Sequence, residues 1–390
     1  MQYDFDKIYS RKNVNSVKWE KMEVMGEGLA ENTLPLWVAD MDFPCPEPVI
    51  QALHKRVDEN IFGYSNFKTD KYFESVINWL HSRFDWKVNQ DDIFLTPGVV
   101  NALDRIIKVF TNEGEGVIIQ EPVYYPFSQK IKNNNRIVIN NQLKNTECYY
   151  EIDFDDLEKK ASEPNNTLMI LCSPHNPVGR VWTYNELNKI AKICAENKVL
   201  LVSDEVHFDI LREGITHIPL PMVTDNDSVI VCTAPSKTFN LAGMQCSNII
   251  IRNEMQKQKW RDTYGDEFLM NPLSIVAVQA AYEEGLDWLN QVNKYIDENL
   301  HFLEAYLKTN LPKVKYKIPE GTYLAWLDFS AYGIGDEKLN NLIRYKASVL
   351  LDEGAIFGES GEGFQRFNVS CPRSILKEAL DRISNEINNI

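Results

Sequence analysis

Lys237 is the residue of this sequence with the clearest potential for covalent chemistry. It follows the apolar run Ser228–Thr233 in the segment SVIVCTAPSKTFNLAG, and Ser236 and Thr238 flank it. A lysine at the end of a buried strand meets little water, so its amine can lose a proton and form a Schiff base with a carbonyl group. Taken alone, a lysine in a loop is more often an ordinary surface residue, so Lys237 needs support from other positions.

A carboxylate closes another apolar run, because Asp204 ends the strand-like part of KVLLVSDEVHFDI. Burying a carboxylate costs free energy unless a cation or a metal ion pairs with it, and a protonated pyridine nitrogen is one such cation. A metal site is the alternative, since Glu205, His207 and Asp209 follow closely. Side chains alternate along a strand, so we expect Asp204 to face away from these three residues, which weakens that alternative.

Two turns after apolar runs could hold other parts of a ligand. Asn176, between prolines in LCSPHNPVGRVW, could direct its amide toward a ligand oxygen, although Asn-Pro is usually only a turn. In TPGVVNALDRI, the pair Pro97-Gly98 turns the chain and a helix begins with Val99 and Val100. Free backbone N–H groups at such a helix start bind phosphate without any positive side chain, although many strand–helix turns share this pattern.

Near the end of the chain, Arg366 lies inside the otherwise apolar run FQRFNVS. A buried arginine requires an anion, and a bidentate pair with a substrate α-carboxylate meets this requirement as well as a structural salt bridge does. The glycine-rich segment FGESGEGF just before it is similar to a phosphate-binding loop. Its two glutamates would repel phosphate, and no strand and helix flank it in the required order, so we interpret it as a turn.

The elements that must position these residues alternate along the middle of the chain. Seven short apolar runs are separated by longer segments, one of which has helical periodicity and begins with a capping box formed by Thr183 and Glu186. Continuous apolar runs predict strands buried on both faces, as in a mostly parallel sheet covered by helices. Ligands of such sheets bind beyond the carboxyl ends of the strands. The seven runs are Ile93–Thr96, Val117–Gln120, Arg136–Ile139, Leu168–Cys172, Val199–Ser203, Ser228–Thr233 and Ser247–Ile251.

We therefore expect an α/β fold with two domains. The large domain, residues 46–285, contains the mostly parallel seven-stranded sheet. After residue 285 the pattern changes to a long helical stretch, two strand-like segments (Gly321–Phe329 and Phe364–Ser370) and a last helix. This order predicts a smaller α+β domain of residues 286–390, to which we assign residues 1–45 as well, with the active site between the two domains.

The overall composition excludes several classes of function. The 390 residues include 41 basic and 56 acidic side chains, a net charge of −15 that disfavours nucleic acids and anionic membrane surfaces as partners. No apolar run is long enough to cross a bilayer, and the start of the chain is charged where a signal peptide is apolar. Seven cysteines without a Cys-x-x-Cys pair fit a reducing compartment. We expect a soluble, cytoplasmic protein.

Taken together and in this order, the candidate residues resemble a known family. The chain is similar over nearly its whole length to fold-type I pyridoxal-phosphate enzymes of the class I/II aminotransferase superfamily, and this resemblance implies the PLP-dependent transferase fold. The matching segments are TPGVVNAL, EPVYYPF, CSPHNPVGRVW, SDEVHFD, SKTFNLAG and FQRFNVSCPR. By this resemblance, pyridoxal 5'-phosphate (PLP) is the cofactor, and Lys237 is the catalytic residue that holds it as a Schiff base.

The resemblance also assigns the other binding residues. Asp204 pairs with the pyridinium nitrogen, Asn176 donates a hydrogen bond to the ring oxygen and Tyr124 stacks on the ring. Arg366 binds the substrate α-carboxylate. Tyr64, in IFGYS, reaches the phosphate and the substrate in the neighbouring subunit, which implies a homodimer with shared active sites. The phosphate is bound by the amides of Val99 and Val100 and by the hydroxyl of Ser236, with the hydroxyl of Thr233 as a further candidate.

Departures from the aminotransferase pattern narrow this prediction. Gln245 stands where an arginine usually contacts the phosphate, and His207 stands where a tyrosine usually lies near the ring oxygen of the cofactor. With the segment LPLWVADMDF, these positions are similar to bacterial cysteine-S-conjugate β-lyases, a group that includes cystathionine β-lyases and the maltose-regulon-modulator type. Trp37 is a candidate to line the distal end of the substrate, although an aromatic residue near a cleft is more often core packing.

The function that this resemblance implies is a PLP-dependent C–S β-lyase. Such an enzyme cleaves cystathionine or another S-substituted cysteine to a thiol, pyruvate and ammonia. Two alternatives stay open: a class I/II aminotransferase with the same cofactor site, and a lyase with an added regulatory role in which its surface binds a transcription factor. The expected partner is a small amino-acid substrate, and we expect no metal, membrane or nucleic acid.

Overall fold

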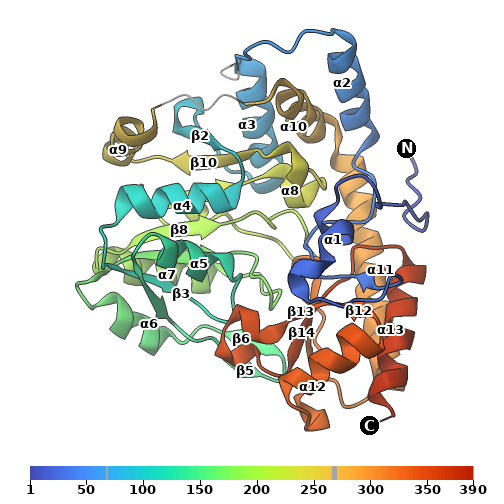
Figure 1. Cartoon of the computed structure of the whole chain (residues 1–390). Helices are drawn as coiled ribbons and strands as arrows, with labels where there is room; N and C mark the ends of the chain where they lie inside the picture. Colours follow the sequence, from blue (N-terminus) through green and yellow to red (C-terminus); the bar gives the residue numbers. More distant parts are fainter. Residues whose placement is uncertain (67–68, 266–269, 390) are drawn as a thin grey trace.

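The structure is a computed structural model of the chain that describes residues 1–66, 69–265 and 270–389. Its main feature is a seven-stranded sheet in which most strands run parallel (Figure 1). Strand β10 is antiparallel to both of its neighbours, β2 and β9. This sheet confirms the predicted fold class, and each of the seven predicted runs overlaps one strand. In sheet order, the strands are β2 (Ile93–Thr96), β10 (Ser247–Ile251), β9 (Ile230–Thr233), β8 (Leu200–Asp204), β7 (Asn166–Cys172), β3 (Gly116–Ile119) and β4 (Ile137–Asn140).

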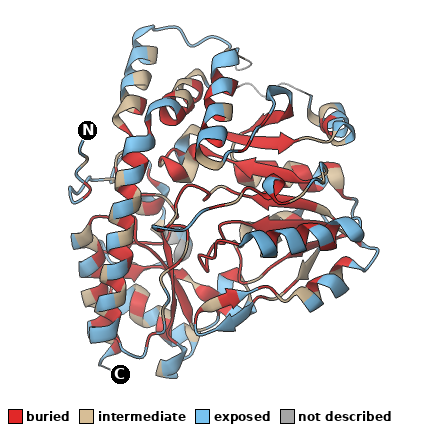
Figure 2. Cartoon of the chain, turned by 180° about the vertical axis from the view of Figure 1, so that it is seen from behind, coloured by how far each residue is buried: buried red, intermediate tan, exposed pale blue. Residues whose placement is uncertain are grey.

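Each face of the sheet packs against its own set of helices, because successive side chains of a strand point to opposite faces. On β3, Ile118 belongs to one buried apolar cluster, whereas Val117 and Ile119 belong to the other. Figure 2 shows the buried strands between helices whose outer sides are exposed. The sheet face that contains Val117 is covered by helices α4 (Val99–Phe110), α5 (Pro126–Asn133) and α9 (Glu254–Tyr264). The opposite face, which contains Ile118, is covered by helices α3 (Asp70–Phe84), α6 (Phe154–Ala161), α7 (Tyr184–Glu196) and α10 (Pro272–Glu284).

The predicted capping box is confirmed at the start of α7. The hydroxyl of Thr183 accepts a hydrogen bond from the amide of Glu186, whose carboxylate accepts one from the amide of Thr183 (2.8 Å). Two free amides of the first turn are thereby satisfied, and the apolar face that begins with Leu187 is buried against the sheet. No helix in the described ranges is long and apolar enough to cross a membrane.

The C-terminal part of the chain forms a second, smaller sheet. Its three antiparallel strands lie in the order β11, β14 and β13, next to the long helix α11 and the last helix α13 (Figure 1). The N-terminal strand β1 joins this part, because it pairs in parallel with β12. The domain bounds of 46–285 and of 1–45 with 286–390 stay a prediction. The elements concerned are β1 (Leu34–Pro35), α11 (Leu286–Asn310), β11 (Leu324–Asp328), α12 (Asp336–Asn341), β12 (Val349–Leu350), β13 (Asp352–Glu353), β14 (Phe364–Asn368) and α13 (Arg373–Ile387).

The remaining short elements complete the connections. Helix α2 lies against α10. The two-stranded hairpin of β5 and β6 follows β4. Helix α8 follows β9 directly and carries Lys237. These elements are α1 (Val17–Glu20), α2 (Glu47–Asp58), β5 (Lys144–Thr146), β6 (Tyr149–Glu151) and α8 (Pro235–Thr238).

The Trp37–Phe43 segment connects the two sheets and passes beside Lys237. Asn368 donates to two of its carbonyl oxygens at 2.7 Å each, and Asn240 donates to two more at 3.0 and 2.9 Å. On its other side, the buried Lys18 and the half-buried Arg11 form ion pairs with its two aspartates. This irregular segment is therefore held in one place by side chains from distant parts of the sequence.

Candidate active site

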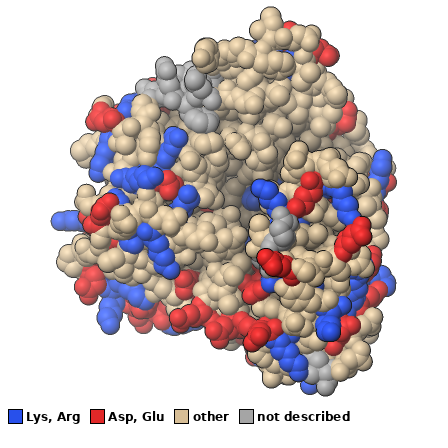
Figure 3. All heavy atoms as spheres, in the orientation of Figure 1, with Lys and Arg blue, Asp and Glu red and all other residues tan. Residues whose placement is uncertain are grey.

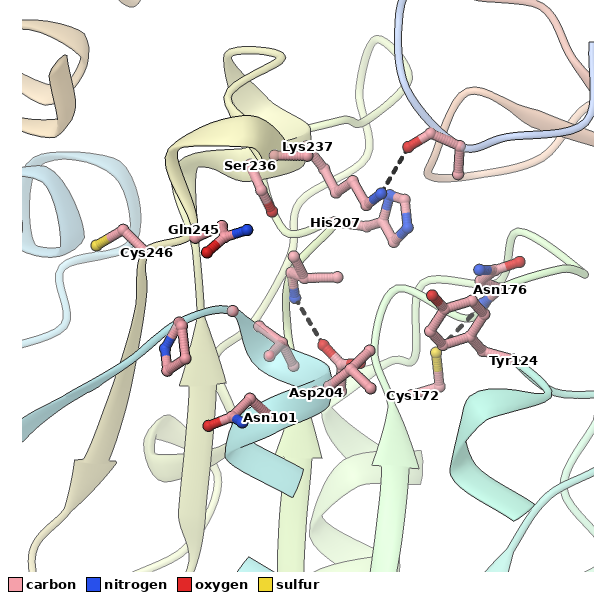
Figure 4. A pocket seen from close by; sticks show the side chains of 17 residues that line it. Asn101, Tyr124, Cys172, Asn176, Asp204, His207, Ser236, Lys237, Gln245 and Cys246 are labelled. Atoms are coloured by element: carbon pink, nitrogen blue, oxygen red, sulfur yellow. Dashed lines mark hydrogen bonds between the residues drawn. The ribbon is translucent and has the colours of Figure 1, made fainter. Parts of the chain in front are cut away.

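A cavity of about 250 Å³ lies at the carboxyl ends of the central strands. Figure 3 shows that this face of the molecule is hollowed near its middle. The position agrees with the rule that open parallel sheets bind ligands beyond the carboxyl ends of their strands. The cavity brings together eight of the predicted site residues (Figure 4): Val99, Val100, Tyr124, Asn176, Asp204, His207, Ser236 and Lys237.

Lys237 extends into this cavity from α8. Its Nζ donates a hydrogen bond to the carbonyl oxygen of Ala39 at 2.5 Å (Figure 4). Burial lowers the pKa of the Lys237 amine to about 8 and outweighs the attraction of Asp40, while Arg366 lowers the pKa further. A neutral amine is therefore accessible near physiological pH, which is what nucleophilic attack on a carbonyl requires.

Asp204 ends β8 and is almost completely buried at the wall of the cavity. Its Oδ1 accepts a hydrogen bond from the amide of Val206 at 3.1 Å. Burial raises the pKa of Asp204 to about 7, although Lys237 and the Val206 amide favour the ionised form. A carboxylate in this state is stabilised by a cation beside it, and the protonated nitrogen of a pyridine ring supplies one.

The expectation that Asp204 faces away from His207 is wrong. Strand β8 ends at Asp204, so the alternation of side chains stops there, and His207 lines the same cavity. Burial lowers the pKa of His207, whose ring packs edge-on against Tyr323 with centroids 5.7 Å apart. Its Nδ1 is buried and has no hydrogen-bond partner within the described chain.

Glu205 and Asp209 do point away from the cavity. The carboxylate of Glu205 accepts hydrogen bonds from the ring of His217 and from a backbone amide, each at 2.9 Å. Asp209 accepts hydrogen bonds from Trp79 and Thr238 at 3.0 Å, and thus ties α8 to α3. In the described ranges, no three His, Cys, Asp or Glu side chains are grouped to hold a metal ion.

The start of α4 forms the part of the cavity that suits a phosphate. Gly98 has φ = +103°, and a Cβ at this position would meet no atom within 4 Å. The amides of Asn101 and Ala102 donate to the Gly98 carbonyl, whereas those of Val99 and Val100 precede the first intrahelical bond. These free amides and the helix dipole fit an anion, and Ser236 and Gln245 face the same space. Thr233 is fully buried and does not line the cavity.

Asn176 and Tyr124 form the opposite side of the cavity (Figure 4). The side-chain oxygen of Asn176 accepts a hydrogen bond from Arg366 Nη1 at 3.0 Å. Because this contact fixes the oxygen, the amide nitrogen of Asn176 is the group left to donate to a ligand. Tyr124 lies just before α5, and burial raises the pKa of its hydroxyl, so the hydroxyl stays neutral. The donors, the buried carboxylate and the free amides together fit PLP.

Arg366 lies next to the cavity in β14 but is held by protein groups. Besides Asn176, it donates to the carbonyl oxygen of Trp37 at 2.8 Å and forms a buried ion pair with Asp352. Asp352 is a residue that the sequence reasoning missed. The signal was a carboxylate at the end of the apolar run SVLLD, the same pattern that singled out Asp204.

Two predicted residues lie away from the cavity. Trp37 is not among the described residues that line it, because its indole is buried and donates to the carbonyl oxygen of Lys18 at 3.0 Å. Tyr64 lies between α2 and α3 with 97% of its surface exposed, so it does not contribute to the site of its own chain. The role of Ala39 as an acceptor for Lys237 was also missed, since a backbone contact leaves no signal in residue type.

Comparisons with known proteins agree with this site. Residues 31–383 match the aminotransferase class I and II family. The chain is 42% identical over 385 residues to cystathionine beta-lyase PatB of Bacillus subtilis, covering 97% of this chain and 98% of PatB. It is 31% identical to protein MalY of Escherichia coli, over 99% of both chains.

Solved structures show the same similarity over full length. Cystalysin from Treponema denticola, which contains PLP, is 39% identical with a TM-score of 0.96 and coverage of 100% of both chains. A PLP-bound C-S lyase from Staphylococcus hominis is 36% identical with a TM-score of 0.95, covering 99% of this chain and 98% of the other. The family resemblance predicted from the sequence is confirmed, and the chain belongs to the class I and II aminotransferase family.

Proposed function

We propose that the chain is a PLP-dependent C–S β-lyase that cleaves cystathionine or a related S-substituted cysteine to a thiol, pyruvate and ammonia. The observation that carries this proposal is the convergence of Lys237, Asp204 and the free amides of α4 in one cavity. The names of its full-length relatives, a cystathionine beta-lyase and a C-S lyase, support the same reaction.

Different residues of the cavity would bind different parts of the cofactor. The amides of Val99 and Val100 and the hydroxyl of Ser236 would hold the phosphate, and Asp204 would hold a proton on the ring nitrogen. When bound, PLP supplies a carbonyl group for the substrate amine and a ring that accepts electrons from the substrate α-carbon. Asp204 strengthens that acceptor, because a negative charge beside the nitrogen keeps it protonated.

Lys237 is the base that removes the α-proton of the substrate. With a pKa of about 8 caused by its burial, the free amine accepts the α-proton of the substrate at Nζ. The carbonyl oxygen of Ala39 accepts a hydrogen bond from Nζ and from the hydroxyl of Tyr323, at 2.5 and 2.8 Å. This acceptor fixes the direction of the amine. Loss of the α-proton then allows the bond between the β-carbon and sulfur to break, with sulfur leaving as a thiolate.

Arg366 would hold the substrate α-carboxylate, and its bond to Asn176 couples that site to the cofactor cavity. We also propose a homodimer in which Tyr64 completes the site of the partner chain. Tyr64 is 97% exposed, and Ile61 and Phe62 beside it are 73% and 55% exposed. A partner chain that covers this apolar segment would place Tyr64 in a protein environment and remove exposed apolar surface from water.

The decisive experiment is a product assay on the purified, PLP-loaded protein. With cystathionine and with several other S-substituted cysteines, we expect equal amounts of pyruvate and thiol. Lys237→Ala should reduce the rate by about a hundredfold to ten-thousandfold while the circular dichroism spectrum stays unchanged. If no substrate yields pyruvate, but 2-oxoglutarate drives amino transfer, the protein is an aminotransferase instead.

A further inference from the structure

The buried pair of Arg366 and Asp352 lies at the proposed carboxylate site. The two residues face each other directly on the neighbouring antiparallel strands β14 and β13. Their side chains are 3% and 2% exposed and form an ion pair between Nη2 and Oδ2. Asp352 Oδ1 is also buried, and no described group donates a hydrogen bond to it.

The positive charge of Arg366 is already compensated by protein groups before any substrate binds. Of its five N–H groups, one is directed to Asn176, one to the carbonyl oxygen of Trp37 and one to Asp352. Its Nε is buried without a hydrogen-bond partner in the described part of the chain. A substrate carboxylate would therefore be the second anion on one guanidinium that is shielded from water.

Among the described residues, the charged groups that act on Asp352 are Arg366, Glu353 and Arg344, and none of them is an uncompensated cation. Arg344 attracts the carboxylate, but its guanidinium forms its own ion pair with Glu353, which repels Asp352. The neutral phenols of Tyr124 and Tyr125 face the pair from the start of α5. Burial raises the pKa of Asp352, and the Arg366 charge lowers it only in part.

We propose that Asp352 takes up a proton from the solvent when a substrate carboxylate binds to Arg366. The proton goes to Oδ1, the oxygen that has no hydrogen-bond donor. Two carboxylates that share a buried site cannot both stay ionised, so the bound substrate keeps the charge and Asp352 becomes neutral. This inference rests on the proposed function, because it takes Arg366 as the carboxylate-binding residue.

Asp352 is then a residue that determines the affinity for carboxylates. Its pKa in the complex is higher than in the free protein, so uptake occurs between these two pKa values. In that range the affinity for a carboxylate falls as the pH rises, by up to about tenfold per pH unit. Asp352→Asn keeps the shape of the side chain but removes the competing charge. This variant should bind carboxylates more tightly than the wild type above the range.

The test uses 3-(methylthio)propionate, which has the skeleton of S-methylcysteine without the amino group and cannot react with the cofactor. Its binding to the PLP-loaded protein is measured by calorimetry in buffers of different ionisation enthalpy, from about pH 5 to about pH 9. The dependence on the buffer gives the number of protons taken up. We expect the wild type to take up as much as one proton more than Asp352→Asn at its maximum.

Two control variants separate the possible failures. Glu353→Gln changes the next carboxylate of the same strand and frees Arg344, so it should move the pH range of proton uptake to lower values and leave the maximum number of protons unchanged. Arg366→Gln should no longer bind 3-(methylthio)propionate, but it should keep the visible absorbance of bound PLP. If Arg366→Gln binds the probe normally, the assignment of Arg366 fails and this inference fails with it. If binding needs Arg366 but the wild type and Asp352→Asn take up equal numbers of protons, this inference alone is overturned.

An infrared measurement on the wild type keeps the test independent of the folding of the variants. Binding of the probe should produce the carbonyl stretch of a newly protonated carboxylic acid in the difference spectrum. The absence of that band throughout the pH series would show that Asp352 stays ionised.

Discussion

At the scale of single residues, burial decides the chemistry of the two groups that define the site. Asp40 and Asp204 favour the charged form of Lys237, but the loss of water around the amine is the larger effect, and the pKa falls to about 8. For Asp204 the same loss of water raises the pKa to about 7. Both side chains are therefore closer to neutrality than they would be in water, and both are stabilised by a ligand of suitable charge.

The first prediction concerns the reactivity of Lys237 in the cofactor-free protein. Because only the neutral amine attacks a carbonyl, the rate of covalent PLP uptake should rise with pH and level off above about 8. Asp40→Asn removes a negative charge that supports the ammonium form, so it should move the midpoint to lower pH. Stopped-flow absorbance measures both midpoints. A midpoint that moves upward in Asp40→Asn would contradict this account.

The second prediction concerns the stability cost of Asp204. Its pKa is about 7 in the folded chain against an ordinary value of 3.8, so folding is disfavoured as the pH rises through this interval, by at most about 4 kcal/mol. Asp204→Asn should therefore make the cofactor-free protein more stable above about pH 7, with no gain below about pH 4. Urea denaturation across a pH series measures the difference.

Bound PLP should reduce the stability advantage of Asp204→Asn, because the charge of Asp204 then has a partner in the wild type. We expect Asp204→Asn to bind PLP more weakly by about 1.5 to 3 kcal/mol, the contribution of a charged hydrogen bond. The matched control is Glu205→Gln, the adjacent buried carboxylate that pairs with His217 outside the cavity. It should destabilise the protein with and without PLP. Equal effects of the two variants would argue against a special role for Asp204.

At the scale of elements, the turn into α4 shows how a backbone conformation makes a binding site. Gly98 has φ = +103°, and this conformation directs the first free amides of the helix into the cavity. The Trp37–Phe43 segment acts in a similar way, since side chains from α8 and β14 contact its carbonyl oxygens. In both places the backbone supplies the polar groups.

The third prediction follows from this turn. Gly98→Ala should reduce the free energy of unfolding by about 1 to 3 kcal/mol through backbone strain and weaken PLP binding about tenfold. Gly114→Ala is the matched control, because Gly114 also has a positive φ of +81° and open space for a Cβ but lies in an exposed turn. It should lose similar stability and no PLP affinity. Thermal unfolding and cofactor titration test the pair. A PLP affinity in Gly98→Ala equal to that of the control would show that the turn does not hold the phosphate.

At the scale of the whole molecule, the site is built from distant parts of the sequence. Asp204 comes from the large sheet, Lys237 from helix α8, and Arg366 from the small sheet. The Trp37–Phe43 segment accepts hydrogen bonds from Lys237 and Arg366 and thus joins these parts. The proposed division into a domain of residues 46–285 and a domain of the remaining residues places the cavity between the two.

The fourth prediction tests the shared site of the proposed dimer. Tyr64→Phe and Lys237→Ala should each be nearly inactive as homodimers. A hybrid of the two has one site with both Lys237 and the partner's Tyr64, so mixing should restore up to about half the activity per hybrid if Tyr64 acts across the interface. If Tyr64 acts in its own chain, the hybrid contains no complete site and mixing restores nothing. Affinity capture through a tag on one of the two variants confirms that hybrids form.

The parts of the fold and of the site that follow local rules could be predicted from residue pattern alone. Seven apolar runs became the seven strands, because burial on both faces requires continuous apolar residues. Lys237, Asp204 and Asn176 each follow such a run, and the ends of parallel strands meet at one edge of the sheet, so their convergence could be predicted. The family resemblance, now confirmed, gave each of these residues a role.

The groups that compensate the charges of these residues follow from the packing of the folded chain. The run SVLLD could have singled out Asp352, but residue type does not show that Arg366 is its partner. Residue type also does not show the contact of Lys237 with the Ala39 carbonyl or the turn that brings His207 into the cavity. Lys237 and Ala39 are 198 positions apart in the chain. The physical reason is that strand ends obey local periodicity, whereas charge compensation in a buried site depends on which distant segments pack against it.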